Sequence, residues 1–380
     1  MPRNAHSKGR ASWKHEKSST YDDINRCFAF SLACPYLFAR DILSLSLASS
    51  AIRSRLCDGA VKVLRADIRD KGNTPSRHFL CLLSKSFPNA KEVILRGNRE
   101  ELFSALKGTA HLQLKRLYLT LCDKEDETLE STMDGRGLAT AIGGFPLLER
   151  LQLNGIGPFS PWSYLKTCSG QHLQMIRLVH CPTLTDACLN TLVSKAPSLL
   201  ELSLEECPSI IAPTLKSTSL TRLRLAHCFS LSWINCKECE NLMILDIPFT
   251  LACNEARSLS SMQSLRHLSL AGALNLQVVD LEEIPSSLSS IDLSACPKLK
   301  SISIGNCVGL FFLDVSFCVG LENLLLQHAH VLEELDLSML INLQSLSLTE
   351  DHSLKRVALY GCDRLPSASV FVNPSCRRFV

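Results

Sequence analysis

The chain has 380 residues, and its formal net charge of +3 is too small to indicate nucleic acid as a partner. Hydrophobic residues make up 46% of the sequence and aromatic residues only 6%, which favours a core of stacked aliphatic side chains. The length allows two or three ordinary domains or one long repeat array.

Residues 1–20 are rich in Ser, His and Lys and show no hydrophobic period. The segment contains one acidic residue, Glu16, and several basic residues, which are Arg3, Lys8, Arg10, Lys14 and Lys17. We expect a disordered basic tail, with a nuclear or organellar address as the open alternative.

Residues 21–60 are expected to form a small helical domain, because apolar residues recur at helical spacing on both sides of Pro35. The run YLFARDILSLSLAS at 36–49 resembles the central part of an F-box, and the resemblance covers residues 22–58. It implies an F-box/leucine-rich-repeat protein, in which this segment docks the adaptor subunit of an SCF-type ubiquitin ligase. The residues that would contact the adaptor are Pro35, Leu37, Ile42, Leu43, Leu45, Leu47 and Ile52. A helical cap over the first repeat coil explains the same pattern, and one helical bundle can serve both purposes.

Residues 61–180 hold irregular repeats, with strands expected around 93–95, 117–119, 151–153 and 176–178. The segment 173–207 resembles the cysteine-containing leucine-rich repeat, L-x-x-L-x-L-x-x-C-x-x-[IL]-T-D-x-x-L-x-x-L. Thr185 and Asp186 there fit a helix N-terminus. The apolar face of that helix would carry Leu189, Leu192 and Val193. This repeat subtype is typical of intracellular F-box/leucine-rich-repeat proteins.

From 199 to 362 the coils shorten, and from 288 onward lines of eleven residues begin L-x-x-[LIV]-x-[LIV]. Asp292, Asp314 and Asp336 occupy the same slot, so an acid returns every 22 residues and one coil comprises two lines. Such a short coil favours extended segments on both sides, because a helix advances about 1.5 Å per residue and a strand about 3.3 Å.

The predicted fold is therefore an α/β solenoid over residues 61–362, a right-handed leucine-rich-repeat superhelix with a parallel concave sheet. We expect helices on the convex side of the early coils and extended segments on the convex side of the later ones. Residues 363–380 are expected to form an irregular C-terminal cap.

Cysteine is frequent, with 18 residues, and many of them recur at one repeat position, namely Cys181, Cys207, Cys228, Cys296, Cys307, Cys318 and Cys362. A recurring slot indicates a small buried side chain rather than a disulfide. The N-terminus has no apolar signal core, and the single N-x-[ST] sequence, at 373–375, contains Pro. These patterns predict a soluble, reduced, intracellular protein of the cytoplasm or nucleus.

Few motifs suggest chemistry. Cys236 and Cys239 form a C-x-x-C without a second pair and are predicted to pack in the core. His328 and His330 have no further metal ligands nearby in sequence, and the glycine cluster at 134–137 fits a helix entry better than a phosphate cradle. No nucleophile, Walker or zinc-protease motif occurs, so we expect no enzyme, no metal and no cofactor.

The concave face is the predicted binding surface. Its early coils present Arg116, Tyr118, Arg150, Arg177, Arg222 and Arg224, and its later coils present Asp246, Asp292, Asp314 and Asp336. This order predicts a change from basic to acidic along the sheet, which would suit a partner with an acidic end and a basic end. Ordinary solvated polar residues are the alternative.

The expected function is substrate recognition for an SCF-type ubiquitin ligase, with the adaptor subunit at residues 22–58 and a protein substrate on the concave face. The chain would then be a monomer within a hetero-complex. A leucine-rich-repeat scaffold without ligase association is the alternative.

Overall fold

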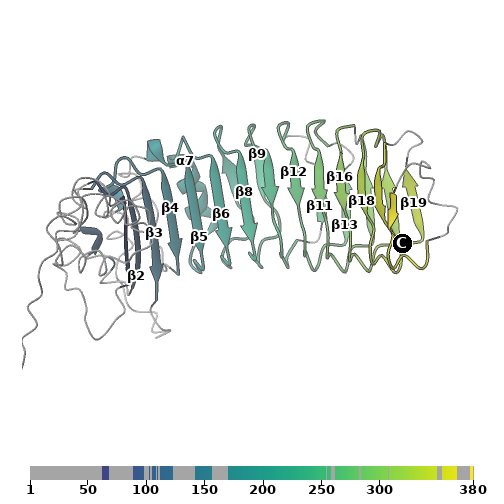
Figure 1. The fold of residues 1–380 in the computed structure, drawn as a ribbon, viewed down its shortest axis with the longest axis horizontal. Coiled ribbons are helices and arrows are strands. Elements are labelled where there is room, and N and C mark those ends of the chain that lie inside the picture. Colours follow the sequence, from purple (N-terminus) through teal and green to yellow (C-terminus); the bar gives the residue numbers. More distant parts are fainter. Residues whose placement is uncertain are drawn as a thin grey trace, which may run out of the picture.

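A computed structural model describes residues 62–67, 89–97, 102, 105–107, 109, 112–122, 142–155, 170–253, 255–257, 262–281, 284–306, 308–348, 353–365 and 377–379. In these ranges the chain forms stacked coils that follow one another in sequence order along the long axis of the molecule (Figure 1). The predictions of a disordered tail at 1–20, of an F-box-like segment with adaptor contacts at 22–58 and of a helix entry at 134–137 concern residues outside the described ranges.

A single parallel sheet of 14 strands, called the main sheet below, runs through the described coils (Figure 1). In spatial order its strands are β1 (Val63–Asp67), β2 (Glu92–Gly97), β3 (Arg116–Leu121), β4 (Arg150–Asn154), β5 (Met175–Val179), β6 (Glu201–Glu205), β8 (Arg222–Ala226), β10 (Ile244–Asp246), β12 (His267–Ser269), β14 (Ser290–Asp292), β16 (Phe312–Asp314), β18 (Glu334–Asp336), β20 (Arg356–Ala358) and β21 (Arg377–Phe379). The spatial order equals the chain order, as in a solenoid. The predicted C-terminal cap thus contains one regular strand, β21, paired with β20.

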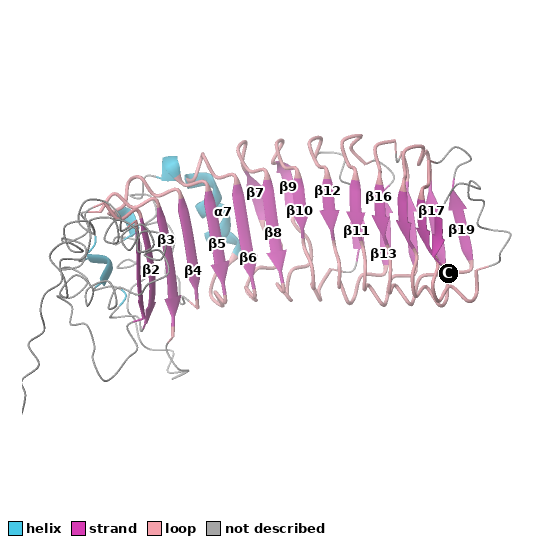
Figure 2. Cartoon of the chain, in the orientation of Figure 1, coloured by secondary structure: helices cyan, strands magenta, loops and turns pink. Residues whose placement is uncertain are grey.

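The other side of the coils changes along the chain (Figure 2). The early part carries the 3-10 turn η4 (Gly170–His172) and the helix α7 (Asp186–Lys195), which lies against β7. Later coils carry a two-stranded sheet of β7 (Thr214–Lys216) and β9 (Asn235–Glu238), and a five-stranded sheet of β11 (Glu255–Arg257), β13 (Val278–Leu281), β15 (Ser301–Ile304), β17 (Asn323–Leu326) and β19 (Ser345–Leu348). This matches the 22-residue period, which leaves no room for a helix.

The core lies between these layers and is built by stacking equivalent aliphatic residues. Ile291 pairs in register with Leu313, and Leu313 with Leu335, in a continuous parallel ladder. Ile291 and Leu313 have no exposed area, and Leu335 is 2% exposed. Each fully buried Leu or Ile contributes about 1.5–3 kcal/mol of transfer free energy, so the repeated column supplies most of the stabilisation.

Helix α7 begins where its capping residues predict. Thr185 is the N-cap, and its Oγ1 accepts a hydrogen bond from the backbone N–H of Cys188 at 3.5 Å. The first-turn carboxylate of Asp186 accepts two backbone N–H bonds from the next coil, from Ile211 at 3.0 Å and Ala212 at 2.9 Å. The predicted apolar face is buried and comprises Leu189, Leu192 and Val193.

The recurring cysteine slot is a structural position. The thiol of Cys318 donates to the carbonyl oxygen of Leu293 at 3.0 Å, and that of Cys362 to Leu337 at 2.9 Å, so each thiol reaches the preceding coil. None of the described cysteines forms a disulfide. The hydrogen bond that the Cys296 thiol donates to Cys318, together with burial, raises the pKa of Cys296. That thiol therefore stays protonated and unreactive.

Candidate functional site

The residues predicted to form the binding surface all lie on strands of the main sheet. Along most of these strands, buried residues that face the core alternate with half-buried or exposed residues that face away from it, as in the pattern of β4. The outward set forms what is called the open face below. The predicted members on this face are Arg116, Tyr118, Arg150, Arg177, Arg222, Arg224, Asp246, Asp292, Asp314 and Asp336.

Most of the arginines on the open face are paired with acids of a neighbouring strand, either the next or the preceding one. Arg177 Nη2 lies 2.8 Å from Glu205 Oε2, and this hydrogen bond lowers the pKa of the Glu205 carboxyl. Arg224 pairs with Asp246 on the next strand. The same holds for Arg116 with Glu92 at 2.7 Å and for Arg222 with Glu201 at 3.7 Å. The early coils are therefore rich in arginine, but their positive charge is largely balanced within the sheet.

The later coils carry a row of carboxylates, called the acid ladder below. Asp292 pairs in register with Asp314, and Asp314 with Asp336, so one carboxylate lies on each of three neighbouring strands. Neighbouring strands lie about 4.8 Å apart, which keeps like charges close. Among the described residues, none of the three forms an ion pair with a cation.

Each acid of the ladder is fixed by its own backbone. The Oδ1 atom of Asp314 accepts a hydrogen bond from the N–H of Ser316 at 2.8 Å, and the same bond to Asp292 and Asp336 measures 3.0 and 2.9 Å. Burial raises the pKa of Asp314, the bonds from Ser316 lower it, and the charges of Asp336 and Asp292 raise it again. The net shift is upward, so Asp314 keeps its proton to a higher pH than an isolated Asp would.

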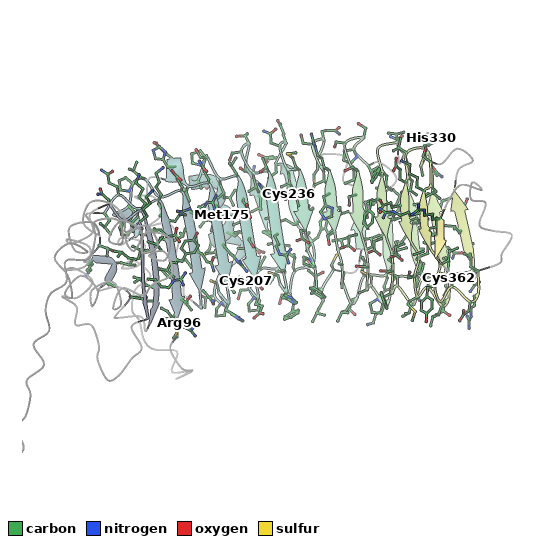
Figure 3. The ribbon with its side chains drawn as sticks, in the orientation of Figure 1. Arg96, Met175, Cys207, Cys236, His330 and Cys362 are labelled. Carbon is green, nitrogen blue, oxygen red and sulfur yellow. The ribbon has the colours of Figure 1, made fainter. Side chains whose placement is uncertain are left out.

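A second repeated feature follows the strands of the main sheet from β4 to β20, at the turn before the cysteine slot. One residue per coil there has a positive φ, and most of these residues donate a backbone hydrogen bond to the next coil; Phe317 N–H, for example, donates to the carbonyl oxygen of Ser338 at 2.8 Å. We call this set the corner row: Gly155, His180, Glu206, His227, Phe249, Gly272, Ala295, Phe317, Met339 and Gly361. Cys207 and Cys362, each directly after a corner-row residue, lie along the same long edge of the molecule (Figure 3).

The corner row carries exposed aromatic side chains. Phe249 and Phe317 are 46% and 56% exposed, and Tyr360, which precedes Gly361, is 66% exposed. The ring of Phe249 stacks on His227 with centroids 4.6 Å apart and planes inclined by 1°. It also extends over Gly272, where an added Cβ would meet Phe249 Cδ1 at 2.4 Å. Side chains of one coil thus reach across the next, and they form a partly apolar edge.

Sequence reasoning missed the corner row and the glutamates that pair with the arginines, although it included Asp246, the partner of Arg224. The residue before each recurring cysteine is at a turn position, where Gly, Asn or Asp is usual. A Phe at that position, such as Phe317 before Cys318, is unusual and could have indicated an exposed aromatic side chain. The acids Glu201 and Glu205 flank the core leucines of their own strand, but their pairing depends on which residues the neighbouring strands bring opposite them.

The other motifs considered in the sequence do not form a recognisable functional site in the described residues. Cys236 and Cys239 are buried in the core, as predicted, with 0% and 1% exposure. The rings of His328 and His330 lie 5.9 Å apart, and the described residues contain no group of three His, Cys, Asp or Glu that could hold a metal ion. Within the described ranges, no helix is both long enough and apolar enough to cross a membrane.

A polar cleft of about 500 Å³ lies at the edge of the middle coils. Its lining includes Ser219, Thr221 and Ser287, whose hydroxyls already donate to backbone carbonyls of the preceding coil. The cleft is therefore largely a product of coil stacking and offers few free donors besides Arg266.

Neither protein-family models nor curated proteins match the chain. Among solved structures, an internalin from Listeria monocytogenes is 14% identical, with a TM-score of 0.40, over 90% of this chain and 93% of that one. A TLR13–ssRNA13 complex is 15% identical, with a TM-score of 0.29, over 81% and 59%. A yeast Rad7–Elc1 complex is 13% identical, with a TM-score of 0.29, over 94% and 95%. The repeat pattern of the sequence and the continuous parallel ladder of the main sheet define the architecture: the chain is a leucine-rich-repeat-type parallel β-solenoid.

Proposed function

We propose that this chain is a protein-interaction scaffold that holds a partner protein against the open face of its main sheet. The observation that carries this proposal is the unbroken ladder of 14 parallel strands, most of whose outward residues are half-buried or exposed. A rigid surface of this kind loses little entropy when a partner binds, which favours affinity.

Site-specific photocross-linking tests this proposal. Ser203 lies on the open face in β6, and Ser303 lies in β15 of the opposite sheet, and both are half-buried. Ser203→benzoylphenylalanine should form cross-links to a protein partner in a native extract, whereas Ser303→benzoylphenylalanine should form few or none. Equal cross-linking from both positions, or none from Ser203, would count against a partner on the open face.

We propose further that the scaffold serves as the substrate-recognition component of an SCF-type ubiquitin ligase in the cytoplasm or nucleus. The support is the F-box-like sequence at 22–58 together with the cysteine-containing repeat at 173–207. In this arrangement no residue of the chain performs chemistry. The chain would raise the effective concentration of the substrate near the ligase.

Co-purification distinguishes a scaffold that associates with the ligase from a scaffold that does not. The full chain should retain the ligase adaptor subunit, a deletion of residues 22–58 should lose it, and a control deletion of residues 1–20 should keep it. If the full chain retains no adaptor, the ligase association is wrong and the scaffold function stands alone.

A further inference from the structure

Two surface features coincide on the C-terminal coils. The acid ladder lies on β14, β16 and β18, and the corner row follows each of these strands within three residues, as Phe317 follows Asp314. Both features repeat once per coil, so they run side by side along the solenoid axis. One surface therefore presents a negative stripe beside a partly apolar stripe.

The apolar stripe contains large apolar side chains that are exposed to solvent. Phe317 and Tyr360 are both more than half exposed, and Met339 extends over the next coil, where its Sδ would lie 3.0 Å from a Cβ added to Gly361. Ile341, two residues beyond Met339, is 42% exposed. A contiguous exposed apolar patch on a soluble protein commonly marks a protein-binding surface.

Among the residues that the structure describes, the negative stripe has no cationic partner. The cation of the adjacent strand, Arg356, is already paired with Glu334, and Lys355 is paired with Glu333 at 2.7 Å. The ladder carboxylates accept only backbone and hydroxyl hydrogen bonds among the described residues. Charge complementarity therefore indicates a cationic occupant.

We propose that this surface binds an amphipathic basic helix of a partner protein, lying along the solenoid axis. The helix would present Lys or Arg at positions i, i+4 and i+7 to the acid ladder and apolar side chains to the corner row. This inference rests on the proposed scaffold function and names the class of partner.

The spacing of the ladder favours a helix over an extended segment. Carboxylates recur about every 4.8 Å, and one face of a helix recurs every 5.4 Å, so the mismatch over two intervals is about 1.2 Å. Side chains on one face of a strand recur about every 6.6 Å, and the mismatch over two intervals grows to about 3.6 Å. Flexible Lys and Arg side chains absorb the first mismatch easily.

Synthetic peptides test the inference against the purified full chain, with binding followed by fluorescence anisotropy. The first peptide is a helix of about 20 residues with Lys at i, i+4 and i+7 beside a Leu stripe. The second has the same composition in an order that scatters Lys around the helix, and the third carries Pro at its centre to prevent helix formation. The first peptide should bind at least about tenfold more tightly than the other two.

Matched variants locate the binding surface. The triple variant Asp292→Asn, Asp314→Asn, Asp336→Asn should weaken binding of the first peptide about tenfold, since Asn keeps the Asx-type hydrogen bond and removes the charge. Asp280→Asn, which removes one carboxylate from β13 on the opposite sheet, should change it little.

The apolar stripe has its own pair of variants. Phe317→Asn should weaken binding, because Asn tolerates the positive φ but removes the ring. Phe249→Asn is the control, since it alters the same turn position beside Asp246, a carboxylate that Arg224 already pairs.

Equal affinity for all three peptides, or full affinity in the triple variant, would overturn the helix assignment. Tighter binding of the Pro-containing peptide would show that the occupant is extended. If Ser203 cross-links a partner but no peptide binds the ladder, this inference fails and the scaffold function survives. If Ser203 cross-links no partner and no peptide binds, both the scaffold function and the basic-helix inference are wrong.

Discussion

Asp314 provides a test of whether the acid ladder is electrostatically strained. Its register neighbours are Asp292 and Asp336, and its pKa is raised above the ordinary value of 3.8, with burial as the largest cause. An acid whose pKa is raised on folding binds protons more tightly in the folded state. Stability is therefore lost as the pH rises from about 3.8 through the folded-state pKa, and the cost is fully present at neutral pH.

The size of this cost follows from the spacing of the ladder. Two unit charges about 5 Å apart in water repel by about 0.8 kcal/mol, and screening at physiological salt, where the Debye length is about 8 Å, roughly halves that value. Two neighbours then contribute about 0.8 kcal/mol, and partial burial adds to it. Because Asn keeps the bond from Ser316 N–H but weakens it, Asp314→Asn should stabilise the protein by about 0.5–1 kcal/mol at neutral pH.

Urea denaturation at several pH values measures this effect, since urea adds no ions. The gain of Asp314→Asn should be largest near pH 7, disappear near pH 3 where both states are protonated, and shrink at about 1 M salt, where the Debye length is about 3 Å. Asp280→Asn is the matched control, because its register neighbours are Arg257 and Ser303 and no carboxylate repulsion is relieved. A loss of stability in Asp314→Asn at neutral pH, or an equal gain in both variants, would refute the reasoning.

Three further predictions concern the solenoid itself, each measured by urea denaturation of the full chain. Leu313→Ala removes a fully buried side chain from the core column and should cost about 2–5 kcal/mol, so a cost below about 1 kcal/mol would show that the column is not tightly packed. Gly309→Ala would place a Cβ 2.1 Å from the carbonyl oxygen of Ser286, and it should destabilise the protein by more than about 1 kcal/mol, an expectation that a neutral result would contradict. Thr185→Ala removes the N-cap of α7 and should cost about 0.5–2 kcal/mol, whereas Thr185→Ser should retain most of the stability.

The coil length was predictable because it equals the number of residues between equivalent positions of the sequence repeat. Asp292, Asp314 and Asp336 recur every 22 residues. This spacing predicts which residues pair across neighbouring strands, and it predicts extended segments opposite the main sheet. The structure contains both the predicted pairing and the extended segments. Helix α7 was predictable for a similar reason, since Thr185 and its apolar face are local signals. The cap at 363–380 was expected to be irregular, but β21 shows that an open sheet edge recruits a strand where one is within reach.

The candidate site was only partly predictable. The predicted residues of the open face lie where the alternation of each strand places them, but the expected change from basic to acidic was based on the central slot alone. In the structure Glu205 and Glu201 neutralise Arg177 and Arg222 from neighbouring strands. The acidic end keeps its charge, because no cation of the adjacent strands is left unpaired beside Asp314.

The sequence by itself determined the stacking of this protein, because identical apolar slots at a fixed spacing have one way to bury their faces, which is in register on one another. It thereby also determined that three carboxylates form a ladder. The tertiary structure alone decided which charges are cancelled, since an ion pair requires two side chains from different coils to meet within about 4 Å. It also decided that Phe317 is exposed and Met339 half-buried at a left-handed turn, because the backbone N–H groups of both residues are hydrogen-bonded to the next coil.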